Sequence, residues 1–228
     1  MATVRAGAMV ALLCGLGLPS TVLGQMPAED TRPLSPAQVA LFETPHLRNI
    51  DGVRTLGYGF VRDGAAGFTD KVTVHIRRVN PDGTKNLAFD YLTGDRQVKL
   101  PELDNFRGNP LLMLTLERDA LEMKDLVGLS TTYFRNKIRE SFVTGAAITG
   151  ATFDLDGTAV PAREITVRPF VGDGRLGRIP SLQAKSYTFV LAEAVPGMIA
   201  EIRIAVPADA AMDAPAFSQR TTFTGVEP

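Results

Sequence analysis

The sequence predicts a single α+β domain, in which a curved antiparallel sheet or unclosed β-barrel carries a short N-terminal helix and a two-helix interlude on one face. Two observations predict this. Segments that alternate large apolar with polar residues, as strands do, occur early and late in the chain. Between them, residues 109–142 follow the 3.6-residue period of helices. Because the helices interrupt two runs of strands, an antiparallel sheet is favoured over a parallel one.

The first 24 residues have the pattern of an export signal. Arg5 precedes an apolar run, residues 8–18, that ends at Pro19. This run is well short of the roughly 20 residues that a membrane-spanning helix needs. We therefore predict a signal peptide over residues 1–24 that is cleaved after Gly24, export to the periplasm, and no transmembrane span in the rest of the chain.

Composition narrows the classes of function. Cys14 is the single cysteine, and Leu13 before it argues against lipid anchoring there, because lipoprotein processing needs a small residue at that position. After cleavage the chain has no cysteine, which excludes disulfides, thiol chemistry and zinc–thiolate sites. It then has 23 basic and 25 acidic residues, a net charge of −2. A protein so close to neutral has no large positive potential that would attract nucleic acid, so we expect no nucleic-acid partner.

The first half of the domain reads as one helix followed by strands. Residues 25–34 are expected to be a flexible leader, and a Ser35-Pro36 start predicts a helix to about Glu43. Alternating apolar residues predict a strand around 56–61 and a hairpin over 71–92, which turns at 80–83. A short strand is expected at 97–100.

The second half begins with the two helices. Asn109-Pro110 predicts the start of the first, Gly128 its end, and Ser130 the cap of the second. Strands are predicted at 153–155, 165–167, 187–191 and 200–206. The single domain is thus expected over 35–207, and residues 208–228 are expected to be a weakly structured tail.

Two motifs resemble enzyme signatures. Residues 153–158, Phe-Asp-Leu-Asp-Gly-Thr, match the box of haloacid-dehalogenase-type phosphatases, but antiparallel alternation follows instead of α/β repeats, so we interpret Asp156-Gly157 as a hairpin turn. Gly172, Gly174 and Gly177 spell a dinucleotide fingerprint, which requires a helix after it. Pro180 blocks that helix, so we interpret 171–183 as a mobile basic loop.

Other chemistry is sparse. His46 and His75 are the two histidines, about 30 positions apart, with no third ligand in a recognisable spacing. No convergent nucleophile, base and acid is visible. We expect no catalytic residue, no metal and no cofactor. A hydrolase with an unrecognised site is kept as a third interpretation of the function.

The order of helix, strands, helical interlude and strands resembles the periplasmic lipoprotein carriers of the Lol type, which have an unclosed barrel with a helical lid. The likeness is architectural and no site residue follows from it. Residues 106–110 and 133–139 are similar to segments of exported proteins from proteobacteria.

Two functions from different classes follow. The leading hypothesis is a non-enzymatic periplasmic binding or carrier protein for an apolar ligand, a lipid or an acylated partner protein, held between sheet and helices. Its candidate ligand-binding residues are Phe60, Phe89, Leu116, Met123 and Phe189. The alternative is an accessory subunit that docks on an exported or outer-membrane assembly. Its candidate partner or anion contacts are Arg135, Arg139, Arg175 and Arg178. The loop 171–183 is expected to form the rim of any ligand site.

Overall fold

A computed structural model describes residues 33–64, 66–209 and 216–227. The chain divides into two units, Met1–Pro33 and Leu34–Pro228, and the fold below is that of the second. The predicted signal peptide, with Cys14 and Gly24, and most of the predicted leader lie outside the described residues.

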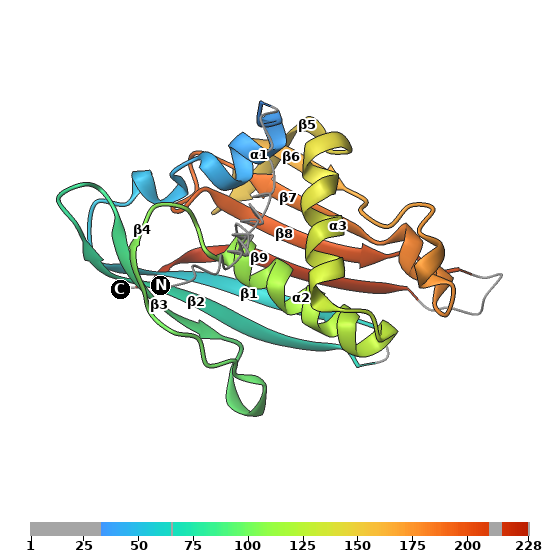
Figure 1. Ribbon diagram of the computed structural model, residues 1–228. Helices are drawn as coiled ribbons and strands as arrows, with labels where there is room; N and C mark the ends of the chain where they lie inside the picture. The colour runs from blue at the N-terminus through green and yellow to red at the C-terminus, as the bar shows by residue number, and fades with distance from the viewer. Residues whose placement is uncertain (1–32, 65, 210–215, 228) are drawn as a thin grey trace, which may run out of the picture. The chain divides into compact units, whose positions relative to one another are not determined.

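The fold is one open antiparallel sheet of nine strands (Figure 1). The strands are β1 Arg54–Asp63, β2 Phe68–Val79, β3 Lys85–Tyr91, β4 Leu103–Phe106, β5 Ala147–Leu155, β6 Thr158–Val167, β7 Ser186–Leu191, β8 Ile199–Val206 and β9 Phe217–Glu227. Their order across the sheet is β4-β3-β2-β1-β9-β8-β7-β6-β5. The α+β class and the unclosed antiparallel sheet agree with the prediction.

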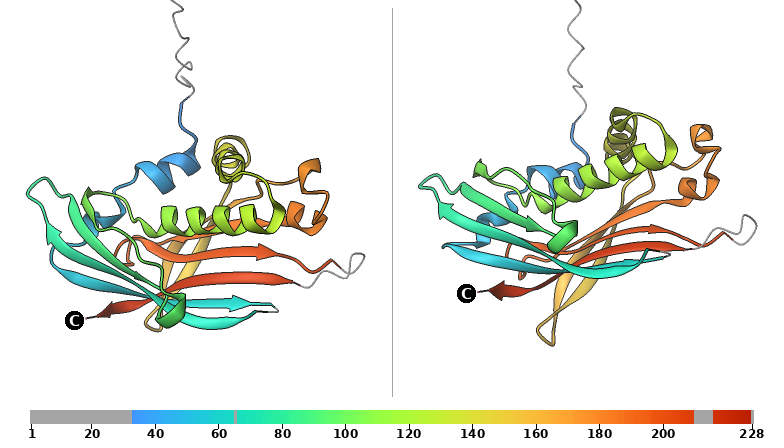
Figure 2. Two further views of the ribbon diagram at one scale, coloured as in Figure 1. Left: turned by 60° about the horizontal axis from the view of Figure 1, so that its bottom comes forward. Right: turned by 90° about the horizontal axis from the view of Figure 1, so that it is seen from below.

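The helices cover one face of this twisted sheet (Figure 2). They are α1 Pro36–Gln38, α2 Leu111–Val127 and α3 Thr131–Thr144, with a π-helical turn η1 Val39–Glu43 and 3-10 helices η2 His46–Asn49, η3 Gly94–Arg96, η4 Gly174–Leu176 and η5 Pro180–Ala184. The helix predicted from Ser35-Pro36 to about Glu43 is present over these residues, but it is α-helical only as far as Gln38 and continues as a π-helical turn to Glu43.

Local sequence explains the ends of these elements. Ser35 and Gln38 form a reciprocal capping box at α1. The Oδ1 of Asn109 accepts from the backbone of Leu111 (3.1 Å), and Gly128 ends α2 with a φ of 83°. The Oγ of Ser130 accepts from the backbone N–H of Tyr133 at the start of α3. These starts and stops agree with the sequence analysis.

The core lies between the helices and the inward-facing side chains of the strands. Tyr58, Phe60 and Val72 are at most 1 % exposed, as are Tyr187 and Phe189 from the other half of the sheet. Strand alternation places these residues on one face, where they bury large apolar areas against the helices. One core therefore spans both halves of the sheet.

Three predictions along the chain are corrected. The predicted weakly structured tail, 208–228, is wrong for residues 217–227, since these form β9, the middle strand, which pairs with both β1 and β8. No strand forms over 97–100, where Val98 makes only an isolated bridge to Tyr91, and the strand that pairs with β3 at this edge of the sheet is β4. The loop 171–183 contains η4 and the start of η5, each with one buried leucine, Leu176 and Leu182.

Two other features bear on the predicted motifs. Asp156 and Gly157, both with positive φ, form the tight turn between β5 and β6, so the phosphatase-like box is a hairpin as predicted. Among the described residues, no helix is long and apolar enough to cross a membrane.

Candidate functional site

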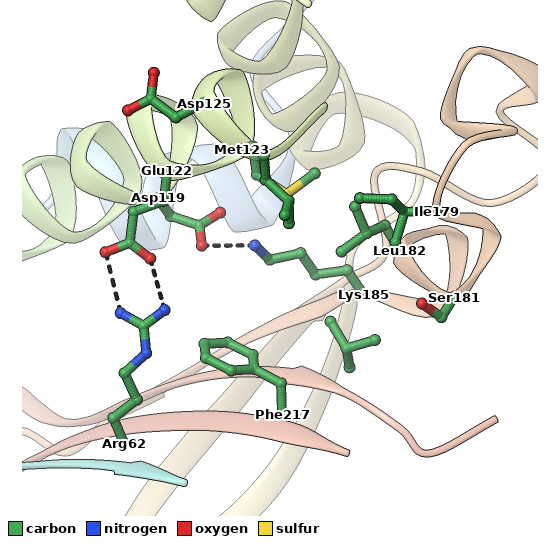
Figure 3. Close-up of a pocket in the computed structure, with 12 residues that line it drawn as sticks. Arg62, Asp119, Glu122, Met123, Asp125, Ile179, Ser181, Leu182, Lys185 and Phe217 are labelled. Atoms are coloured by element: carbon green, nitrogen blue, oxygen red, sulfur yellow. Dashed lines mark hydrogen bonds and ion pairs between the residues drawn. The ribbon is translucent and has the colours of Figure 1, made fainter. Parts of the chain in front are cut away.

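A cleft of about 510 Å³ opens between the second half of α2, η5 and the adjoining ends of the sheet strands (Figure 3). It is lined by Arg62, Asp119, Glu122, Met123, Asp125, Leu126, Ile179, Ser181, Leu182, Lys185, Val206 and Phe217. These residues come from helix, loop and strand, so the cleft exists only in the assembled fold. It has an apolar part and a charged part.

The apolar part is formed where α2 faces η5 and the start of β9. Met123 is buried in the wall, whereas Leu126 is 59 % exposed at the end of the helix. Ile179 and Leu182 contribute from the opposite side, and Phe217 closes the sheet side. Exposed and half-buried apolar side chains around one concavity are typical of sites for apolar ligands.

A buried ion pair lies in the charged part. Lys185 Nζ donates to Asp119 Oδ1 at 2.6 Å, and Tyr187 Oη donates to Asp119 Oδ2 at 2.5 Å. Asp119 and Lys185 are each 4 % exposed. Burial and the neighbouring Asp119 charge raise the pKa of Tyr187 well above its ordinary value, so its hydroxyl remains a donor. Both carboxylate oxygens are thus satisfied, as a buried charge requires.

A second cluster joins two arginines to one glutamate, and two of its three residues, Arg62 and Glu122, line the cleft. Glu122 accepts from Arg118, one helical turn before it, at 2.8 Å and from Arg62 of β1 at 3.2 Å. Arg118 lies over the ring of Phe60 and Arg62 over that of Phe217. The Nη1 atom of Arg118 is buried with no hydrogen-bond partner in the described part of the chain. Two guanidinium groups for one carboxylate give this cluster an excess of positive charge.

The five predicted ligand-binding residues do not form one site. Met123 lines the cleft, and Ile179 and Ser181 place the loop 171–183 at its border. Phe60 and Phe189 are fully buried in the core, and Phe89 is 9 % exposed. None of these three lines the cleft.

Leu116 instead lines a second cavity, a groove of about 460 Å³ between η1, α2 and α3. The groove is lined by Gln38, Phe42, Met113, Leu116, Glu117, Arg135, Ile138, Arg139 and Phe142. Phe42 and Met113 are 41 % and 48 % exposed there. Leu116, predicted to bind a ligand between the sheet and the helices, thus lines a groove between helical segments instead.

The four predicted partner arginines are divided. Arg135 and Arg139 both line the groove, and Arg135 Nε donates to Glu117 Oε2 at 2.7 Å, which lowers the pKa of Glu117. Arg175 lies over the Tyr133 ring, with 5.1 Å between its guanidinium carbon and the ring centroid. Neither Arg175 nor Arg178 lines the cleft or the groove.

One arrangement has the composition of a hydrolase triad. His75 Nδ1 lies 3.0 Å from Thr55 Oγ1, and His75 Nε2 lies 2.8 Å from Asp90 Oδ2. The three residues face outward from neighbouring strands, and none lines the cleft or the groove. Together the three side chains form a polar ladder across β1, β2 and β3.

The second histidine, His46, is fully buried beneath η1. Its Nε2 donates to the Ala40 carbonyl at 2.8 Å and its Nδ1 accepts from the Asn109 backbone, which fixes a neutral imidazole. Burial lowers its pKa. Over the residues that the structure describes, no group of three or more His, Cys, Asp and Glu side chains is placed to hold a metal ion.

Sequence reasoning missed most of the cleft. Arg62, Leu126 and Lys185 come from β1, α2 and the segment after η5, and Phe217 lies in the segment that was expected to be a tail. No spacing in the sequence connects these positions. Two parts of the cleft do have a sequence signal: Met123, predicted as a ligand-binding residue, and the glycine-rich loop 171–183, predicted to form the rim of a ligand site.

Comparisons with known proteins add little. No protein-family model matches the chain, and no curated protein matches it. Among solved structures, the chain is similar to a crystal structure of the Mycobacterium tuberculosis lipoprotein LppX. The identity is 13 %, the match covers 85 % of this chain and 97 % of that chain, and the TM-score is 0.34.

Proposed function

We propose that the protein is a non-enzymatic periplasmic binding or carrier protein for an amphiphile, with the apolar body of the ligand in the cleft between α2, η5 and the sheet. The observation that supports this is the division of one cleft into an apolar part, with Leu126 largely exposed, and a charged part. An exposed leucine beside the half-buried Ile179 and Phe217 in one concavity favours an apolar ligand.

The charged part favours an anionic head group. Glu122 neutralises only one of the two arginines that it contacts, Arg62 in the cleft and Arg118 behind it, while Asp119 and Lys185 neutralise each other. Asp125, the third carboxylate of the lining, is paired with Lys124 at 3.5 Å. A carboxylate or phosphate near Arg62, which is 25 % exposed in its side chain, would form charge-assisted hydrogen bonds. The ligand class is therefore a fatty acid, an anionic lipid or an acyl group on a partner protein. Export to the periplasm is the part of the proposal that depends on the predicted signal peptide.

Leu126 and Leu121 provide a matched test. Both are exposed leucines of α2, at 59 % and 44 %, but only Leu126 lines the cleft. The Leu126→Glu substitution places a charge against the apolar body of the ligand, and we expect it to weaken binding of a fluorescent fatty acid by about tenfold or more. Leu121→Glu should bind as the wild type does. Equal affinities for all three proteins, or no binding by the wild type together with no lipid in its native mass spectrum, would contradict the proposal.

The groove favours the second candidate function, an accessory subunit that docks on another exported protein. Phe42 and Met113 are exposed beside Arg139, which has an Asn136 contact but no ion pair among the described residues. Arg139→Glu should then abolish recovery of a specific partner from periplasmic extract, whereas Arg48→Glu, outside the groove, should not. Recovery that is unchanged by Arg139→Glu would exclude the groove as the docking site.

A further inference from the structure

The two edges of the sheet differ in a way that points to an interaction surface. At one edge, β4 has four residues, an irregular register with β3, and Asn105 at a positive φ of 55°. Short strands and irregular pairing are devices that prevent an edge from adding another strand. At the other edge, β5 has nine residues and pairs with β6 without interruption.

The β5 edge has none of the protections that β4 has. From Ala147 to Phe153 it contains no charged residue and no proline, and its register with β6 has no bulge. Residues 147–150 are all exposed, and the hairpin of β5 and β6 projects beyond the neighbouring strands (Figure 2). Its outer backbone groups are therefore free to pair with another strand.

We propose that β5 pairs antiparallel with β5 of a second copy of this chain, which makes one continuous sheet through a twofold axis. A second copy is favoured because the strand is complementary to itself. With the axis at Ala151, all nine residues pair, Phe153 lies opposite Thr149, and Thr152 lies opposite Gly150. Aromatic residues opposite β-branched residues stabilise antiparallel pairs.

Charge favours the same register. Asp154 is the one charged residue of β5. With the axis at Ala151 it lies opposite Ile148 of the partner copy, so like charges do not meet, whereas an axis at residue 154 would place two carboxylates face to face. Twofold pairing also occupies both β5 edges, so no free β5 edge is left for a third copy. The product is therefore a dimer and not a fibre.

The test compares two double variants that differ only in the sign of one charge. Gly150 has a negative-φ backbone with open space where a Cβ would lie, and Thr152 is exposed. In the proposed register, Gly150→Lys with Thr152→Lys creates two directly opposed Lys–Lys pairs. Gly150→Lys with Thr152→Glu creates two Lys–Glu pairs instead. We expect the wild type to dimerise in sedimentation equilibrium, and the first variant to dissociate at least about tenfold more readily than the second.

A disulfide cross-link tests the dimer independently of the charge variants, so it does not depend on whether a β5 strand with added charges folds correctly. The predicted mature chain lacks cysteine, so an Ala151→Cys variant has one thiol, on the axis and opposite its symmetry mate. Mild oxidation should give a disulfide-linked dimer, whereas Thr158→Cys, exposed on β6, should stay monomeric. A wild type that is monomeric at every concentration would overturn the proposal. The same holds if its β5 edge binds only a different polypeptide. Equal dimerisation of the two charge variants, or equal cross-linking of the two cysteine variants, would also overturn it.

Discussion

Asp119 holds its negative charge inside the protein because two donors, Lys185 and Tyr187, occupy its two oxygens. Removing one partner from a buried ion pair is costly, while replacing both partners by apolar residues often is not. Lys185→Met should therefore lower the free energy of unfolding by about 3–5 kcal/mol in urea denaturation. The double variant Asp119→Leu with Lys185→Met should recover much of that loss. A double variant as unstable as Lys185→Met alone would contradict this account.

His46 makes stability depend on pH. Its folded-state pKa lies below the ordinary 6.5, because burial disfavours the charged ring. The unfolded state thus binds the proton more readily, and stability should fall as pH decreases from about 6.5 through the lower folded-state pKa. The melting temperature of the wild type should drop over this range more than that of His46→Gln, whose amide can still donate to Ala40. If the melting temperatures of the two proteins fall equally with pH, another group is responsible for the pH dependence of stability.

Arg62 determines the head group in the proposed function. Arg62→Gln keeps a donor but removes the charge, so the dissociation constant for a fatty acid should rise by about tenfold, while that for the matching fatty alcohol should hardly change. Arg48→Gln, which removes an exposed arginine paired with Glu193 away from the cleft, is the control. An equal loss for acid and alcohol would mean that Arg62 shapes the cleft and does not bind the anion.

At the scale of elements, the turn between β7 and β8 connects η2 and the start of α2 to the sheet through hydrogen bonds. Gly197 accepts from Asn109 Nδ2 at 3.1 Å and donates to Asn49 Oδ1 at 3.0 Å, with a φ of 77°. A Cβ at this position would lie 2.9 Å from Leu56 Cδ1, in the core. The turn therefore needs glycine for both its backbone conformation and the close approach of its neighbours.

Gly83 separates these two effects. It has a similar φ of 82°, but a Cβ there would meet nothing within 4 Å. Gly83→Ala should cost about 1 kcal/mol through its backbone alone, and Gly197→Ala clearly more, on the order of 2–3 kcal/mol, in urea denaturation. Equal losses of unfolding free energy in the two variants would mean that Leu56 and its neighbours can shift to admit the added Cβ without further destabilisation.

The elements that the sequence predicted have strong local signals, and those it missed do not. Asn109 accepts from the backbone N–H of Leu111 at the start of α2, Gly128 ends that helix, and Ser130 caps α3. By contrast, β9 turns Gln219, Thr221 and Phe223 inward, all buried. Because two of these three are polar, no apolar alternation marks the strand. The cleft could not be predicted for a related reason. Its residues are far apart in sequence and come together only by tertiary packing, which leaves no periodic pattern in the sequence.

At the scale of the whole molecule, β9 holds the two halves of the sheet together. It lies between β1 and β8 and buries Thr221 completely. A chain that ends at residue 209 lacks this strand, so β1 and β8 lose their shared neighbour and Phe217 is missing from the cleft. We expect this truncated chain to show no cooperative thermal transition by circular dichroism. A cooperative transition near that of the full chain would mean that the halves are joined mainly through the helices.

The position of β9 also sets when the sheet can be completed. Its first residues pair with the end of β1, where Ser218 donates to Asp63 across 155 positions of sequence. Bringing such distant segments together has a large entropic cost and is slow compared with hairpin formation. Because β9 lies in the middle of the sheet although it follows every other described strand in sequence, the sheet stays in two unjoined halves until β9 has been made and paired.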